Sequence, residues 1–331
     1  MILYSNKAGT ITKMMMRSII LSEAISWLKG SKYGHTYKDK IILFLYIFNA
    51  IIIIIIIIGI FGKNKAIDIY FKRTYLLNWI PVKSVLVKRD GIMLSLPMIL
   101  DYIILVKPDW EEKEIEFMTQ LNLNDNNNAI IIDIGANIGI YTILMSHIYP
   151  KAKIIAIEAS PTIFEILKSN CKLNNLLLLR SGSNVVLINK ALSDKDDMTI
   201  EFYEKHSMST MLKEFLTNLS TIILTNHDQL NKKLVRTVTI DNLVETININ
   251  EISLLKIDIE GAEVLALKGA INTLTQKKIK NMVIEYHSLE NYNYIIKLLE
   301  KELGYTIINS QKRFNKETGY VNGHIMAILQ E

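Results

Sequence analysis

At 331 residues the chain is long enough for one large domain with an appendage, and half of its residues are hydrophobic, as a globular protein can accommodate. Its single cysteine, Cys171, excludes an intramolecular disulfide. The net charge of +5 is unevenly distributed, because residues 1–107 carry +10 and the remainder −5. The negative charge of the larger part argues against extended nucleic-acid binding there, and the positive charge of the N-terminal part suits contact with anionic lipid headgroups.

The first strong feature in chain order is the run Ile41–Phe61, which holds twenty-one uncharged residues, including eight consecutive isoleucines at 51–58. About 20 apolar residues cross a bilayer core of roughly 30 Å. The run therefore predicts a transmembrane helix within a basic, hydrophobic helical appendage over residues 1–83. The alternative is a hydrophobic element packed on the rest of the protein. Four Lys and Arg residues within fifteen positions on each side leave the orientation undecided.

Residues 84–128 are predicted to connect this appendage to the main domain. Ser84–Leu96 has the pattern of a β-hairpin with its turn at Asp90-Gly91. A hairpin in this position can serve as a lid over a cofactor cleft.

From Ala129 onward, short apolar runs alternate with helical patterns, which predicts a doubly wound, mostly parallel α/β sheet over residues 129–331. The last two core strands are expected to pair as an antiparallel edge, and a polar insertion over 204–233, between two additional strands, is expected to face the substrate. The core strands are predicted at 130–134, 153–157, 184–189, 253–258, 282–286, 305–309 and 324–329, and the additional strands at 198–203 and 235–240.

The first core strand ends in Asp133-Ile-Gly135-Ala-Asn137-Ile-Gly139, after which a helical pattern begins. Gly and Asn tolerate positive φ, and glycine lets a ligand approach the backbone closely. A strand, a glycine loop and a helix N-terminus form a site for the polar part of a nucleotide-like cofactor.

The spacing of this loop favours S-adenosylmethionine (SAM) over NAD. The dinucleotide pattern G-x-G-x-x-G is absent. Glu158 ends the second strand, 19 residues after Gly139, where a carboxylate can accept both ribose hydroxyls. Asp133 suits a cationic methionine moiety better than a pyrophosphate. Asp194 is a candidate for the adenine end, with a turn residue as the alternative.

Candidate catalytic residues follow the fourth and fifth core strands. Asp258, Glu260 and Glu263 are three carboxylates within six residues, and their repulsion can raise a pKa toward that of a general base, although one of them could instead cap the next helix. His287 is a second candidate base, with a hydrogen-bonded structural histidine as the alternative. No cluster of Cys and His predicts a metal site.

Several blocks of the chain, in this order and at these separations, resemble the FkbM family of SAM-dependent methyltransferases over roughly residues 110 to 330. The blocks are 156–161, 170–174, 189–194, 238–243, 254–263 and 283–287, of which Lys256-Ile-Asp-Ile-Glu-Gly-Ala-Glu263 is the most specific. The resemblance implies a Rossmann-like class I methyltransferase that O-methylates hydroxyls, often on sugars or polyketide-type products. One departure is Ala159-Ser160-Pro161, where the family often has proline directly after the acidic residue.

We therefore expect a SAM-dependent O-methyltransferase acting on a glycan, a lipid-linked sugar or a similar metabolite, and not on nucleic acid. The expected location is the membrane with the catalytic domain in the cytoplasm, or the cytoplasm if residues 41–61 do not span. A nicotinamide-dependent oxidoreductase and a non-catalytic, membrane-associated SAM-binding module remain as alternatives. The acceptor and the oligomeric state are left open.

Overall fold

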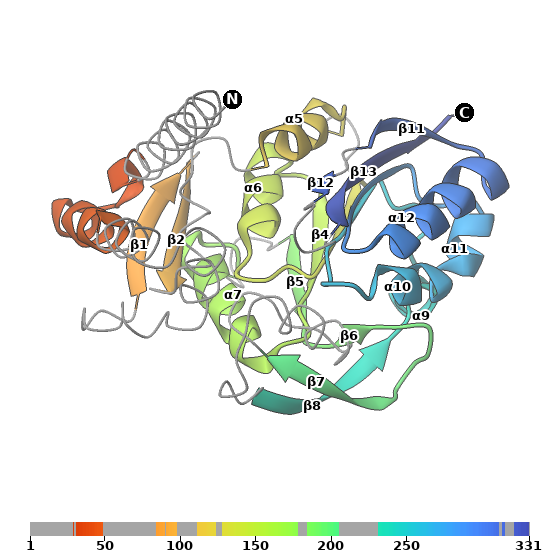
Figure 1. The fold of residues 1–331 in the computed structure, drawn as a ribbon, viewed down its shortest axis with the longest axis horizontal. Coiled ribbons are helices and arrows are strands. Elements are labelled where there is room, and N and C mark those ends of the chain that lie inside the picture. The colour runs from red at the N-terminus through yellow and green to blue at the C-terminus, as the bar shows by residue number, and fades with distance from the viewer. Residues whose placement is uncertain are drawn as a thin grey trace, which may run out of the picture. The chain divides into compact units, whose positions relative to one another are not determined.

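The computed structural model describes residues 29, 31–48, 84–89, 91–97, 111–123, 128–177, 184–204, 231–310, 313–314 and 321–330. The chain divides into two compact units, residues 1–110 and 111–331 (Figure 1).

The first unit contains a short 3-10 helix η1 (Ser31–Tyr33), a helix over 37–48, and the strands β1 (Ser84–Arg89) and β2 (Ile92–Pro97). The helix begins at a capping box, because the Thr36 Oγ1 accepts from the Asp39 N–H and the Asp39 carboxylate accepts from the Thr36 N–H. The strands pair antiparallel with Arg89 opposite Ile92, and Gly91 has φ +85°. The predicted hairpin is confirmed.

The predicted transmembrane helix is not supported by the described part of the chain. Residues 41–48 of the apolar run are helical, but residues 49–61 lie outside the described residues. Among the helices that the structure describes, none is both long enough and apolar enough to traverse a bilayer.

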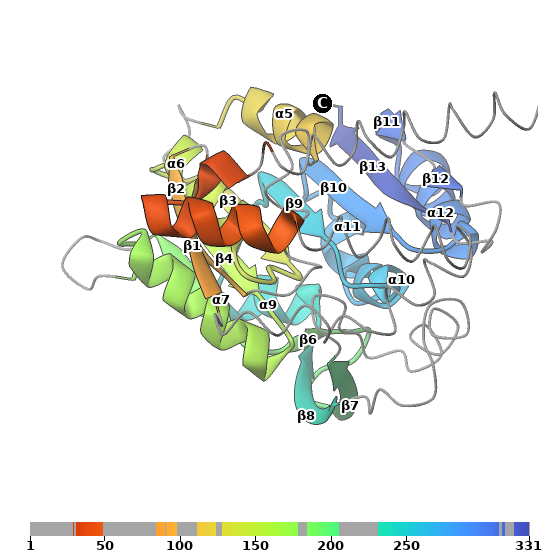
Figure 2. The ribbon, with the colours of Figure 1, turned by 60° about the vertical axis from the view of Figure 1, so that its left-hand side comes forward.

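The second unit is built on one mixed sheet whose strands run in the order β11-β13-β10-β9-β3-β4-β5. Six of the seven strands run in one direction, and β13 enters antiparallel between β10 and β11 (Figure 2). The bounds are β3 (Ile130–Ile134), β4 (Lys153–Ile157), β5 (Val185–Ile188), β9 (Leu254–Ile257), β10 (Asn281–Tyr286), β11 (Tyr305–Ser310) and β13 (Val321–Leu329), with β12 (Arg313–Phe314) paired to β13. All seven predicted core strands are present, and the last two pair antiparallel as expected.

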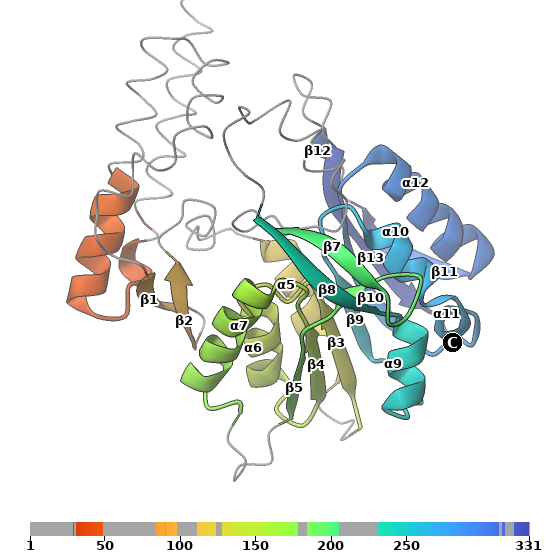
Figure 3. The ribbon, with the colours of Figure 1, turned by 90° about the horizontal axis from the view of Figure 1, so that it is seen from below.

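Helices cover both faces of this sheet, which explains why its central strands β3 and β9 are almost entirely apolar, with Asp133 of β3 and Lys256 of β9 as the charged residues. Figure 3 shows α5, α6 and α7 on one side and α9 to α12 on the other. Every residue of β9 is buried, as expected for a strand covered on both faces. The helices are α5 (Glu112–Gln120), α6 (Ile140–Ile148), α7 (Pro161–Leu173), α9 (Ile240–Thr246), α10 (Glu263–Lys268), α11 (Ile271–Thr275) and α12 (Leu289–Ile296), which continues as the π-helix η4 (Lys297–Glu302).

A small second sheet lies between the third and fourth core strands in the sequence. Its order is β6 (Ala191–Leu192), β8 (Asn231–Val238) and β7 (Thr199–Glu204), so both predicted additional strands are present. Of the predicted insertion over 204–233, residues 205–230 lie outside the described residues.

Candidate active site

A pocket opens at the carboxyl ends of β3, β4 and β9. From β3 the chain adds β4 and β5 on one side of the sheet and later β9 and β10 on the other, so β3 and β9 flank the point where the strand order switches direction. Such a switch point is where ligands bind in open α/β sheets. The empty space, including the open mouth, is about 590 Å³, which is the size of a small-molecule site. Gly135 and Asn137 line the pocket after β3, and Glu158 and Ala159 line it after β4. After β9 the lining residues are Asp258, Ile259, Glu260 and Ala262, and those in or next to the second sheet are Lys190, Ala191, Leu192 and Phe202.

The glycine loop has the backbone conformation that its composition predicts. Gly135, Asn137 and Gly139 have φ values of +73°, +52° and +96°. The N–H groups of Gly135 and Ala136 both donate to the Ile157 carbonyl, which ties the loop to β4. A Cβ at position 135 would lie 1.7 Å from the Asp258 carbonyl oxygen, so only glycine fits there. Gly135 and Asn137 line the pocket, whereas Gly139 precedes α6 and packs on Leu167.

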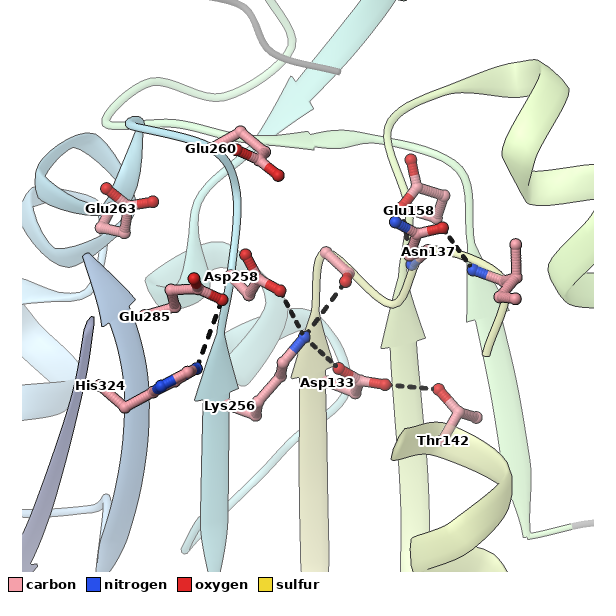
Figure 4. Close-up of polar contacts among 12 residues, drawn as sticks. Asp133, Asn137, Thr142, Glu158, Lys256, Asp258, Glu260, Glu263, Glu285 and His324 are labelled. Atoms are coloured by element: carbon pink, nitrogen blue, oxygen red, sulfur yellow. Dashed lines mark hydrogen bonds and ion pairs between the residues drawn. The ribbon is translucent and has the colours of Figure 1, made fainter. Parts of the chain in front are cut away.

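Glu158 lies in the pocket wall, as predicted for a ribose ligand. Its carboxylate accepts from the N–H of Asn137 at 2.9 Å and of Ser160 at 2.8 Å. Figure 4 shows Glu158 beside Asn137. Burial raises the pKa of Glu158 to about 7 even though these two hydrogen bonds lower it. The side chain is therefore fixed in place and titrates near neutral pH.

Asp133 lies beneath the pocket and is not among its lining residues. The Thr142 hydroxyl donates to it at 2.6 Å, and the Lys256 ammonium lies 3.5 Å away. Lys256 is buried and lies 3.5 Å from Asp258 and 3.3 Å from the Gly135 carbonyl (Figure 4). Its ammonium also sits over the Tyr141 ring. Asp133 and Lys256 thus join β3, β9 and α6 below the cofactor loop. The signal for Lys256 was present in the sequence as the one charge inside an apolar strand.

Asp258 and Glu260 line the pocket on the side opposite Glu158 (Figure 4). Glu260 has φ +51° and is followed by Gly261 at φ +99°, so the chain turns sharply after β9. Burial raises the pKa of Glu260 to about 8, with Asp258 and Glu285 adding to the rise against the opposing charge of His287. Burial also raises the pKa of Asp258. Either carboxylate is chemically suited to accept a proton near neutral pH.

His287 is buried beside this pair and is not among the lining residues. Its Nδ1 lies 2.8 Å from Glu263, and its Nε2 lies 3.4 Å from Glu260 and 3.6 Å from Glu285. Although burial lowers it, the carboxylates of Glu263 and Glu260 raise the pKa of His287 well above its usual value. His287 is thereby placed to orient Glu260, and Glu263 is a partner of the histidine as well as the first residue of α10.

A second group of polar residues lies farther along the sheet and was not anticipated. His324 of β13 contacts Glu114 at 2.9 Å and Glu285 at 3.4 Å. Burial lowers the pKa of His324, but Glu114 and Glu285 raise it to about 10. Burial, with Glu285 nearby, raises the pKa of Glu111 to about 8. The available signal was one carboxylate or imidazole in each of two largely apolar strands, Glu285 in β10 and His324 in β13.

Asp194 is exposed and is not among the lining residues; the Ser193 hydroxyl donates to it at 3.2 Å. Its neighbours Lys190, Ala191 and Leu192 lie at the pocket instead.

This strand order, with the glycine loop at the switch point and a carboxylate after the second strand, defines a class I SAM-dependent methyltransferase. Residues 133–307 match the model of the methyltransferase FkbM domain. The chain belongs to the FkbM methyltransferase family, and SAM is its cofactor.

Curated relatives agree with this class. Methyltransferase 1 of Beauveria bassiana (strain ARSEF 2860) is 30% identical over 169 residues, which cover 48% of this chain and 65% of that protein. The hexuronic acid methyltransferase AglP of Haloferax volcanii is 25% identical over 194 residues, which cover 59% of this chain and 70% of that protein. The chain thus spans just under two thirds of the length of the Beauveria protein.

A further relative acts on RNA by its name. The tRNA(Phe) (4-demethylwyosine(37)-C(7)) aminocarboxypropyltransferase of Methanocaldococcus jannaschii is 33% identical over 93 residues, covering 28% of this chain and 33% of that protein. The expected exclusion of nucleic acid is therefore not supported. Among solved structures, M. jannaschii TYW2 in complex with AdoMet has a TM-score of 0.37 and 18% identity, over 74% of this chain and 85% of that one.

Proposed function

We propose that this methyltransferase transfers the methyl group of SAM to a hydroxyl oxygen of a glycan, a lipid-linked sugar or a related metabolite. The observation that carries the proposal is the pair of carboxylates, Asp258 and Glu260, in the wall of the pocket opposite Glu158. A hydroxyl is a weak nucleophile, so its methylation gains from a base at this position.

Glu260 accepts the hydroxyl proton as the oxygen attacks the methyl carbon. The new C–O bond forms while the C–S bond breaks, and S-adenosylhomocysteine leaves with the bonding electron pair on sulfur. His287 is the positioning residue for Glu260, at 3.4 Å. Gly135 and Asn137 bound the methionine end of the cofactor, Glu158 accepts from its ribose, and Asp133 supports the loop from below.

Two observations support a sugar-type acceptor. AglP, a relative, is a hexuronic acid methyltransferase by name. After the fourth core strand this chain has Asp258-Ile-Glu260-Gly261, not the Asn or Asp with two prolines and an aromatic that enzymes methylating nucleobase amines place there.

The apolar run Ile41–Phe61 motivates the lipid-linked part of the proposal. In this proposal the run anchors the chain in the membrane, and the catalytic unit faces the cytoplasm, where SAM is made.

The test is transfer of tritium from methyl-labelled SAM into a cell extract that is then separated into lipid, glycan, RNA and protein. Label in glycan or lipid that is stable to mild base, and is lost with Glu260→Gln, supports O-methylation of a sugar. Label confined to RNA or protein would refute the proposed acceptor class.

SAM binding, measured by calorimetry, separates the remaining alternatives. Glu260→Gln should bind SAM as the wild type does while transfer falls by on the order of 100-fold, the usual contribution of a general base. A wild type that binds SAM but labels no fraction would favour a binding module.

A further inference from the structure

Three side chains with metal-binding atoms converge at the floor of the pocket. One ligand atom from each of Asp258, Glu260 and His287 lies within 4.8 Å of the others. The carboxylates follow β9 and the imidazole follows β10, so no spacing along the sequence predicts the set. Two carboxylates and one imidazole form a donor set that suits divalent first-row metals.

His287 has the hydrogen-bonded support that metal-binding histidines have in other proteins. Glu263, which is fully buried, already accepts from the Gly261 N–H at 2.9 Å and from the Asn291 amide at 2.7 Å. It is therefore an acceptor for the His287 Nδ1–H as well, at 2.8 Å. This bond fixes the ring so that Nε2 faces the Glu260 and Glu285 oxygens. A carboxylate on the far nitrogen is the usual outer contact of a metal-bound histidine.

The balance of charge around Nε2 also calls for a cation. Three carboxylates, those of Asp258, Glu260 and Glu285, face this space. With the neighbouring Asp133, Glu263 and Glu114 these make six carboxylates, against three described groups that can carry positive charge: Lys256, His287 and His324. Buried carboxylates that crowd together are stabilised by a bound cation or must take up protons.

We infer that Asp258, Glu260 and His287 hold one divalent cation, with Mn²⁺ or a chemically similar ion as the best match to two carboxylates and an imidazole. The Asp258 and Glu260 side chains are about a quarter exposed, at 26% and 22%, on the pocket side, which gives the ion a route of entry. The role of the ion rests on the proposed function: it would hold the acceptor oxygen beside the methyl donor and ease loss of its proton. Glu260 would bind the ion through one carboxylate oxygen and accept the proton on the other. Binding of the ion does not depend on that function.

The test is a titration with Mn²⁺ of the whole chain, from which metal has first been removed with a chelator. Electron paramagnetic resonance measures the Mn²⁺ that stays free. We expect one saturable site. Asp258→Asn and His287→Ala should each weaken binding at least 10-fold, and Glu263→Gln should weaken it about 10- to 100-fold because the ring loses its support. Glu251→Gln, which removes an exposed carboxylate that precedes the amino end of β9, should change nothing.

The visible absorption of bound Co²⁺ depends on its ligands, so it distinguishes metal binding by His287 from a purely structural role of this residue. The visible spectrum of the Co²⁺-loaded chain should shift in His287→Ala, with circular dichroism showing that the variant is folded. No saturable binding of Mn²⁺, Mg²⁺ or Zn²⁺ to the wild type, or equal binding to Asp258→Asn, would overturn the inference. Methyl transfer that persists in excess EDTA in a chain without Mn²⁺ binding would leave the proposed function intact. Mn²⁺ binding at these residues without any methyl transfer would support the inferred metal site and refute the proposed methyl transfer.

Discussion

At the residue scale, Glu158 links cofactor binding to pH. Its pKa of about 7 means that the carboxylate is protonated in mild acid and ionised above neutral pH. In the proposed ribose contact only the ionised form accepts from both hydroxyls, so SAM affinity should fall as the pH drops below about 7.

Calorimetry between pH 5.5 and 8.5, a range chosen to bracket a pKa of about 7, measures this. Glu158→Gln should weaken SAM binding at the upper end on the order of 10- to 100-fold, the worth of a hydrogen bond to a charged group, and should flatten the pH dependence. Glu165→Gln, an exposed carboxylate on α7, is the matched control. An unchanged slope in the Glu158 variant would contradict the ribose role.

Gly135 is the residue where backbone and packing demands coincide. Gly135→Ala meets the Asp258 carbonyl and must keep φ at +73°, so the free energy of unfolding should fall by about 2–5 kcal/mol. Gly304→Ala has φ +76° but nothing within 4 Å, so it should cost only about 1–2 kcal/mol. Urea unfolding of both variants measures the difference, and equal losses would mean that the close approach to β9 does not matter.

At the scale of elements, a side chain from the end of α6 holds the C-terminal end of α5. The Tyr149 hydroxyl lies 2.6 Å from the Met118 carbonyl and 2.7 Å from that of Leu121. Tyr149→Phe leaves both carbonyls without this donor and should lower the free energy of unfolding by about 1–3 kcal/mol. Hydrogen exchange in Glu112–Gln120 should quicken most. Tyr305→Phe, which removes a bond to the Ile279 carbonyl, should leave exchange in α5 unaltered; a uniform effect of the two variants would count against local anchoring.

Most of this architecture could be predicted from the sequence because its signals are local. Isoleucine-rich runs bounded by loops marked β3 and β4 to the residue, and Gly135, Asn137 and Gly139 marked the cofactor turn. The polar contacts around Glu285 could not be predicted in this way. His324 meets Glu114 across more than 200 positions, and this contact exists only because β13 enters the sheet beside β10 and near α5. The ion pair of Asp133 with Lys256 could not be predicted either, because alternation along β3 does not say which buried charge a strand end will meet.

At the scale of the whole molecule, the membrane proposal concerns residues beyond those described. If Ile41–Phe61 anchors the chain, carbonate washing should leave it in the membrane fraction, and replacing three of the isoleucines at 51–58 with lysine should release it, because each charge costs about 2.5–3.5 kcal/mol at a helix centre. SAM binding by the released variant serves as the folding control. Release of the wild type by carbonate would remove the anchor.

The position of β13 has a consequence for how the protein is made. Because this strand lies between β10 and β11, the hydrogen-bonding edge of β10 stays open until residue 329 has left the ribosome, whereas β3, β4 and β5 are translated early. An open edge of this kind can pair with other chains. During synthesis there is therefore an interval in which β3, β4 and β5 have been made but the edge of β10 is still exposed to pairing with other chains. A chaperone that covers β10 would act in that interval.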